Sequence, residues 1–253
     1  MDRVDLATVA SFLCGSPLVA GETVDLGEEV AHHMRVRRLD VGAQVGLRDG
    51  SGGIGTGVLQ RLAKSSATVA VREVRRQERP PAVHMIVPVA DRDRMLWLAE
   101  KCTELGAASW RPVMWSRSRS VSPRGEGDAF EAKVRARMAG ALSQCEGAWL
   151  PALHATASPA EAIAGVPAQG VRLLLDVDGA PLGTRALTPP VTVAVGPEGG
   201  FERAERDQLV AAGFAPVALP GNVLRFETAG VTGLALALAA LATSTGGNGG
   251  RSR

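Results

Sequence analysis

The sequence is poor in cysteine, and its few cysteines are widely separated. The 253 residues include Cys14, Cys102 and Cys145, an odd number without a C-x-x-C pair. Disulfide frameworks and zinc ribbons need several cysteines at short spacings, so neither class fits. The adjacent His32 and His33 have no second group of potential ligands, so we expect no metal. Three reduced thiols point to a cytoplasmic protein.

The sequence also lacks a long apolar run. The longest apolar-rich stretch, Ala229 to Ala242, is interrupted by Thr232 and Gly233. It falls short of the roughly 20 residues that a helix needs to span a bilayer. Residues 1–15 carry two acidic residues and no basic segment leading into an apolar run, which argues against a secretory signal. We therefore expect no membrane segment.

A large excess of charge of one sign is missing as well. The formal net charge is +2, so a nucleic-acid surface must be a local patch. The chain is 45% hydrophobic and 21% charged, which is normal for a soluble protein with a sizeable core. Its length exceeds the roughly 100–200 residues of one domain, so two domains are expected.

The pattern changes along the chain at a polar segment. Between Thr23 and Val74, short strands separated by glycine turns predict a small antiparallel barrel or sandwich. Residues 75–81, RRQERPP, suit an exposed linker, and strands alternate with helices after it, which indicates an α/β domain. The predicted units are a barrel domain at 1–75, a linker at 76–82, an α/β domain at 83–243 and a disordered tail at 244–253.

The expected elements of the α/β domain follow from periodicity and capping residues. The strands are expected at 83–89, 110–115, 171–177, 192–195 and 216–219, and the helices at 91–105, 128–145, 203–212 and from 228, with a capping box at 158–161 opening a further short helix.

One glycine-rich segment of the barrel domain resembles a dinucleotide fingerprint. Residues 50–55, GSGGIG, match the pattern G-x-G-x-x-G. The residues after it are typical of a strand, whereas the fingerprint opens a helix. A hairpin turn is therefore the better interpretation.

Two loops that follow strands carry the strongest functional signal. They are GPEGGF at 196–201 and PGNVLRFETA at 220–229. Ligands of α/β sheets bind outside the carboxyl ends of strands, yet neither loop has the lysine and hydroxyl of a triphosphate cradle. Glu198 would repel a phosphate and attract a cation. Alternatively, it stabilises the N-terminus of the next helix by about 0.3–1 kcal/mol.

Several motifs resemble those of the RsmE-type ribosomal RNA small-subunit (uracil-N3) methyltransferases of the SPOUT superfamily. GPEGGF is followed by L-x-x-x-V-L-R-x-E-T-A at 219–229. Upstream, residues 94–106 end in K-x-T-E-L-G, Arg117-Ser118 matches an R-S pair, and residues 32–39 are similar to an H-H-L segment. The motifs keep the family's order and cover nearly the whole chain.

The resemblance implies a PUA-like β-barrel joined to a SPOUT-type α/β domain with a deep trefoil knot. It also implies S-adenosylmethionine as cofactor and a homodimer with cofactor sites near the subunit interface. The apolar helix at 229–242 suits such an interface, with an intramolecular core as the alternative. S-adenosylmethionine is a cation without phosphate, which agrees with loops that lack lysine. The implied cofactor-binding residues are Leu175, Val195, Gly196, Pro197, Gly199, Gly200, Leu219, Pro220, Val223 and Leu224.

The implied reaction moves a methyl group from sulfur to N3 of a uridine in 16S ribosomal RNA. We assign to Arg225 the stabilisation of the developing uracil anion, with a structural salt bridge as the alternative. Glu198 or Glu227 accepts the N3 proton, directly or through water, or orients Arg225. The sequence leaves these roles open.

The expected RNA contacts lie in two arginine clusters. For any single arginine of these clusters, a solvated surface position is the better interpretation, and the clusters indicate RNA contact more strongly than their members. The predicted RNA-binding residues are Arg35, Arg37, Arg38, Arg117 and Arg119, with Gln144 from a run similar to the family's E-A-x-E-Q-S. Two other functions are compatible with the sequence: methylation of another RNA uridine, and a non-catalytic RNA-binding or ribosome-assembly factor.

Overall fold

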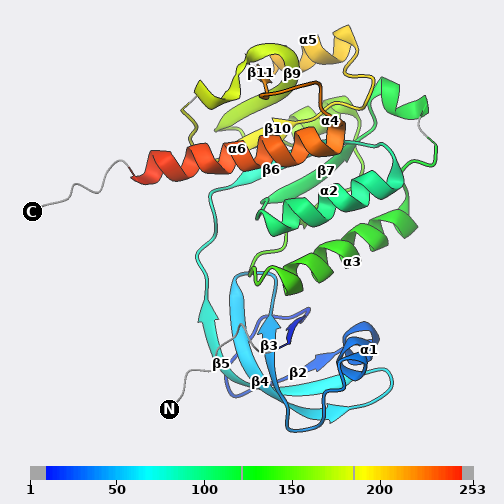
Figure 1. The fold of residues 1–253 in the computed structure, drawn as a ribbon, viewed down its shortest axis with the longest axis vertical. Coiled ribbons are helices and arrows are strands. Elements are labelled where there is room, and N and C mark those ends of the chain that lie inside the picture. The colour runs from blue at the N-terminus through cyan, green and yellow to red at the C-terminus, as the bar shows by residue number, and fades with distance from the viewer. Residues whose placement is uncertain (1–9, 121, 185, 247–253) are drawn as a thin grey trace, which may run out of the picture. The chain divides into compact units, whose positions relative to one another are not determined.

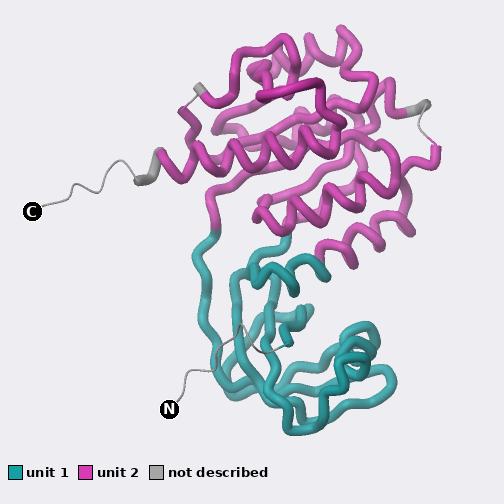
Figure 2. The backbone as a smooth tube through the Cα atoms, in the orientation of Figure 1, with its two compact units in different colours: residues 1–79, 139–150 teal, residues 80–138, 151–253 magenta. Residues whose placement is uncertain are grey.

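The protein is described by a computed structural model that covers residues 10–120, 122–184 and 186–246. The chain divides into two compact units (Figure 2). Unit 1 contains residues 1–79 and 139–150, and unit 2 contains residues 80–138 and 151–253. The contact-based division thus places 139–150 with the N-terminal unit, and the domain limits expected from the sequence stay a prediction.

Unit 1 is built on a strongly curved five-stranded sheet. Strand β1 pairs with β3 in parallel, and the other pairs are antiparallel. The β4–β5 pairing shifts register at two positions, and such bulges bend and twist long strands. The strands follow the order β1 (Ser11–Leu13), β3 (Gln44–Arg48), β4 (Gly53–Leu62), β5 (Ala67–Arg76) and β2 (Thr23–Leu26).

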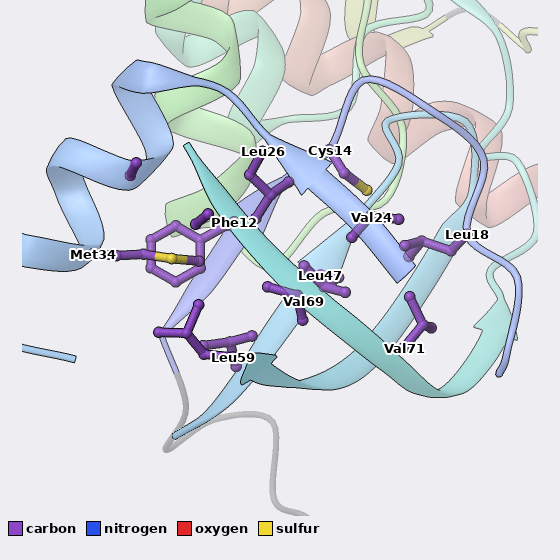
Figure 3. Close-up of a cluster of buried hydrophobic side chains, with 13 residues drawn as sticks. Phe12, Cys14, Leu18, Val24, Leu26, Met34, Leu47, Leu59, Val69 and Val71 are labelled. Carbon is purple, nitrogen blue, oxygen red and sulfur yellow. The ribbon is translucent and has the colours of Figure 1, made fainter. Parts of the chain in front are cut away.

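The inner face of this curved sheet holds the apolar core of unit 1 (Figure 3). Phe12, Leu47 and Val69 are buried there from three different strands. Helix α1 (Glu28–Val36), which was not predicted, adds Ala31 and Met34 to the same core. The helix therefore completes a core that the short strands alone do not enclose.

The glycine-rich segment at 50–55 forms a hairpin, as predicted. Strand β3 pairs with β4 from Arg48 opposite Ile54 onward. The Asp49 carboxylate accepts hydrogen bonds from the amides of Ser51 (2.7 Å) and Gly53 (2.8 Å). Backbone amides that would be free for a dinucleotide phosphate are thus bound within the turn.

Unit 2 contains a parallel six-stranded sheet, which confirms the predicted α/β class. Threading of the chain through a knot is a separate property and stays a prediction. The strand order is β11 (Ala215–Ala218), β9 (Val171–Pro181), β10 (Val191–Ala194), β6 (Val83–Pro88), β7 (Ser109–Val113) and β8 (Ala152–Leu153). The helices are α2 (Arg92–Glu104), α3 (Asp128–Gln144), α4 (Pro159–Ala164), α5 (Arg203–Ala211) and α6 (Phe226–Gly246), with short 3₁₀ turns η2 (Ser116–Ser120) and η3 (Leu182–Thr184).

Side-chain caps fix the helix starts that were expected from the sequence. The Asp91 carboxylate accepts from the amide of Arg94 at 3.0 Å and so begins α2. Gly106 follows that helix with φ of 81°, the left-handed conformation in which glycine ends helices. Ser158 and Glu161 form the predicted capping box of α4. Local sequence therefore sets where α2 and α4 begin.

Helix α6 is the most apolar element of the chain. By length and composition its segment Phe226–Thr243 is long and apolar enough to cross a membrane, although 33% of that segment is buried inside the protein. It packs against α2, β6 and β10 (Figure 1). A Cβ on Gly230 would lie 3.0 Å from the Leu98 side chain, so the two helices approach closely there. Part of α6 thus packs in the core of unit 2, and its expected place in a dimer interface stays a prediction.

The predicted tail at 244–253 begins inside this helix. Helix α6 continues to Gly246, and residues 247–253 lie outside the described residues.

Candidate functional site

A cavity of about 460 Å³ is lined by residues 175–178 in the middle of β9 and by the GPEGGF and PGNVLRFETA loops, which follow β10 and β11. Most of the residues predicted to bind the cofactor line it. These are Leu175, Val195, Gly196, Pro197, Gly200, Leu219, Val223 and Leu224. Gly199 and Pro220 belong to the same loops but do not line the cavity. The parallel sheet thus brings together segments that are up to 49 positions apart in the sequence, from Leu175 to Leu224.

The GPEGGF loop has a shape that two of its glycines make possible. A Cβ on Gly196 would lie only 2.9 Å from the Phe201 ring, so the ring can pack against the backbone there. Phe201 also meets the buried Trp115 edge to face, with ring centroids 4.8 Å apart. Gly200 has φ of 72°, and its amide donates to the Pro197 carbonyl at 2.8 Å. The turn is therefore a compact, aromatic-backed wall of the cavity.

The two candidate carboxylates meet one guanidinium that the sequence did not identify. Arg94 Nη1 lies 3.3 Å from Glu198 Oε1, and Arg94 Nε lies 3.9 Å from Glu227 Oε1. The Glu198 side chain is 34% exposed and the Glu227 side chain only 12%. Among the described residues, Glu227 Oε2 is buried without a hydrogen-bond partner. One oxygen of Glu227 is thus held near a cation while the other is free.

Arg225 has a different environment from these carboxylates. Its side chain is exposed, and within the described part of the chain it forms no ion pair. Its carbonyl accepts the amide of Ala229 at 2.8 Å, the first turn of α6. The salt bridge considered for Arg225 is therefore not formed within the described residues, and neither Glu198 nor Glu227 pairs with it there.

The cavity wall also contains an ion pair that was not predicted. Arg206 Nε donates to Asp176 Oδ2 at 2.6 Å, and the Asp178 amide donates to Asp176 Oδ1 at 3.0 Å. Burial alone would raise the pKa of Asp176, but the Arg206 guanidinium and the Asp178 amide lower it below its ordinary value. An ionised carboxylate therefore faces this region. Asp176 directly follows Leu175, a predicted cofactor-binding residue, and this position in the sequence could have indicated its place in the site.

The residues predicted to contact RNA fall in separate places. Arg117 donates to the Gly199 carbonyl and so lies against the GPEGGF loop. Arg119 belongs to η2, and its side chain lies outside the described part of the structure. Arg35 and Arg38 are exposed on α1 and just after it. Arg37 and Gln144 line a second cavity in unit 1.

A metal centre is not visible in the described ranges. Within residues 10–120, 122–184 and 186–246, no group of three His, Cys, Asp or Glu side chains could hold a metal ion. The expectation of a metal-free protein stays a prediction.

Comparison with known families places this fold and cavity in one class. The family described as "RNA methyltransferase domain" matches residues 77–238, and the family described as "RNA methyltransferase PUA domain" matches residues 26–72. The chain belongs to this RNA methyltransferase family. The fold class implied by the resemblance, a methyltransferase domain preceded by a PUA-like domain, is confirmed.

Individual relatives within the RNA methyltransferase family include enzymes of small-subunit ribosomal RNA. The chain is 29% identical to the ribosomal RNA small subunit methyltransferase E of Synechocystis over 221 residues, covering 84% of this chain and 72% of the relative. It is similar to a crystal structure of ribosomal RNA small subunit methyltransferase E from Neisseria gonorrhoeae bound to S-adenosyl methionine, with a TM-score of 0.82, 27% identity, and 92% and 98% of the two chains covered. A predicted RNA methyltransferase of Thermotoga maritima gives a TM-score of 0.71 at 29% identity, covering 91% and 98%.

Proposed function

We propose that the protein transfers a methyl group from S-adenosylmethionine to N3 of a uridine in 16S ribosomal RNA. The observation that carries the proposal is the cavity formed by the two loops after β10 and β11 together with residues 175–178 of β9, all within the part of the chain that the family matches. Its relatives include small-subunit RNA methyltransferases, one of them bound to this cofactor.

The residues around this cavity fit such a cofactor. Its volume of about 460 Å³ lies within the range of small-molecule sites. Leu219, Val223 and Leu224 offer apolar walls for an adenine ring. The lining carries more carboxylates than guanidinium groups, since Arg206 pairs with Asp176 while Asp178 and Glu198 also line the cavity, and this balance suits a cation-bearing ligand better than a phosphate. When bound, S-adenosylmethionine supplies an electrophilic methyl group on a sulfonium.

The residues of the chain itself would then position the uridine and move its proton. N3 of uracil carries a hydrogen, which must leave as the N–CH₃ bond forms. We assign the acceptor role to Glu227, because its buried Oε2 has no hydrogen-bond partner among the described residues, whereas Glu198 Oε1 is bound by Arg94. Arg225, exposed and without an ion pair within the described residues, would stabilise charge on the uracil carbonyl oxygens. Arg94 would hold both carboxylates in place.

RNA contacts in this proposal come mainly from arginines. Phosphates would be contacted by Arg35, Arg37 and Arg38 of unit 1, by Arg117 against the GPEGGF loop, and by Arg119 of η2. A homodimer through the exposed side of α6 and a cytoplasmic location complete the proposal. Light scattering after size exclusion tests the dimer.

The decisive experiment compares mapped modifications of small-subunit RNA between a deletion strain and its parent. The proposal requires loss of one N3-methyluridine, restored by the wild-type gene. An unchanged N3-methyluridine content would refute it. Calorimetry with S-adenosylmethionine separates an enzyme from a non-catalytic RNA-binding factor, since the factor would show no binding.

A further inference from the structure

Unit 1 contains a second cavity, of about 620 Å³, that lies between β1, α1 and the end of α3. We call it the α1–α3 cavity. Its polar lining includes Glu29, His33 and Arg37. Glu29 and His33 lie four positions apart on one face of α1, and Arg37, four positions further on, is the C-cap residue directly after the helix. The helix therefore presents a continuous polar stripe to the cavity, while its Ala31 and Met34 pack into the core.

The end of α3 forms the opposite wall. Gln144, the last residue of the helix, and Glu146, just beyond it, both line the cavity. Glu146 has φ of 57°, a left-handed conformation that a residue other than glycine rarely adopts. The chain thus turns sharply at the cavity, and Trp149 then donates to the carbonyls of Gln77 and Glu78 at 3.2 Å. The wall is fixed to the rest of unit 1.

Three polar side chains of the cavity are available to a ligand. Among the described residues, the side chains of Glu29, Arg37 and Gln144 take part in no hydrogen bond or ion pair. Leu13 and Val30 add apolar surface to the same lining. A space of this size, with apolar walls and free donors and acceptors, is the pattern of a small-molecule or single-nucleotide site.

The charges of the lining indicate which part of a nucleotide would enter. Two carboxylates, Glu29 and Glu146, oppose one guanidinium, Arg37, so a phosphate inside the cavity would be repelled. Carboxylate oxygens instead accept hydrogen bonds from the amino groups of bases, and the Gln144 amide can both donate and accept. Unpaired RNA bases are recognised in this way on their edges.

We propose that the α1–α3 cavity binds one unpaired nucleotide of the RNA substrate, other than the uridine that is methylated. Its base enters between α1 and α3, and its phosphate stays outside, near Arg37. Bases with an exocyclic amino group are favoured over uracil, because Glu29 and Glu146 need donors. The inference rests on the proposed function only in taking RNA as the substrate.

Matched neighbours on α1 allow a sharp test. Glu29→Gln and His33→Ala change the cavity, whereas Glu28→Gln and His32→Ala change exposed residues of the same helix that do not line it. Equilibrium binding to small ribosomal subunits from a strain lacking the enzyme is measured by filter retention for all four variants. We expect each cavity variant to bind at least about fivefold more weakly, with both controls within twofold of wild type.

The effect of Glu29→Gln also shows whether a base or a phosphate of the RNA occupies the α1–α3 cavity. If a phosphate occupied the cavity, removing a negative charge would tighten binding, and the proposal would be overturned. The slope of log affinity against log salt gives a second criterion, since loss of a base contact leaves the slope unchanged, whereas loss of a phosphate contact reduces it by about one. Unchanged binding for both cavity variants would also overturn the proposal.

The binding assay does not depend on methyl transfer. Calorimetry of S-adenosylmethionine with the same variants should give wild-type affinity, because the cofactor cavity lies in unit 2. A wild-type protein that binds subunits without methylating them would contradict the proposed reaction, while the comparison of His33→Ala with His32→Ala would still decide the use of the α1–α3 cavity.

Discussion

Replacing Arg94 tests whether this residue acts through Glu227. At 3.9 Å, unit charges with an effective dielectric constant of about 20 attract one another by roughly 4 kcal/mol. The contact is an ion pair without a hydrogen bond and the Arg94 side chain is 36% exposed, so solvent reduces this value to about 1.5–3 kcal/mol. We therefore expect Arg94→Ala to slow methyl transfer by about 10- to 100-fold.

The assay is a single-turnover transfer of labelled methyl to unmethylated small subunits at saturating cofactor. Glu227→Gln removes the proposed proton acceptor and should cost at least about 100-fold. The double variant Arg94→Ala/Glu227→Gln should be no slower than Glu227→Gln alone, because Arg94 would have no acceptor left to position. The affinity for S-adenosylmethionine should not change in any of the three.

Glu198→Gln is the control for the other half of the Arg94 contact. This pair is about one-third exposed on both sides, so its loss should cost at most about 1 kcal/mol, or fivefold. If the effects of Arg94→Ala and Glu227→Gln multiply in the double variant, Arg94 does not act through Glu227 and the reasoning is refuted. A larger loss in Glu198→Gln than in Glu227→Gln would move the acceptor role to Glu198.

Three further outcomes follow from the site and the cores. Gly196→Ala places a Cβ 2.9 Å from the Phe201 ring, so calorimetry should show S-adenosylmethionine binding weakened by about tenfold, whereas Gly183→Ala, with nothing within 4 Å, should leave it unchanged. The pKa of Asp176 is lower in the folded protein than its ordinary value of 3.8. Its ionised form therefore stabilises the fold above pH 3.8, and this stabilisation is lost as the pH falls through the folded pKa. Urea unfolding midpoints measured between pH 7 and pH 3 should decline less for Asp176→Asn than for wild type. Burial, with Asp49 nearby, raises the pKa of the Cys14 thiol to about 11, so iodoacetamide at pH 8 should modify the exposed Cys145 rapidly and leave Cys14 intact until the protein unfolds.

The sequence predicted those features that local patterns determine. Strand periodicity and the capping box at Ser158 predicted the main elements of unit 2, because these signals lie within a few residues of each element, whereas the two-residue strand β8 was not predicted. Helix α1 was missed, since its apolar positions, Ala31 and Met34, occur in a short segment between strands and only the tertiary core explains them. The grouping of residues 139–150 with unit 1 was also out of reach, because it depends on contacts of Ala148 and Trp149 with distant residues.

The contact between Arg94 and Glu198 shows what additional information the sheet order supplies. In a parallel sheet, every residue that directly follows a strand lies at the same edge, but only adjacent strands bring such residues together. Strand β10 pairs with β6, so the loop that carries Glu198 lies beside the start of α2, where Arg94 is found. The two residues are 104 positions apart, and no spacing rule relates them. Each residue lies in a sequence motif, yet their interaction depends on β10 lying between β9 and β6. A different strand order would leave Glu198 without this cation.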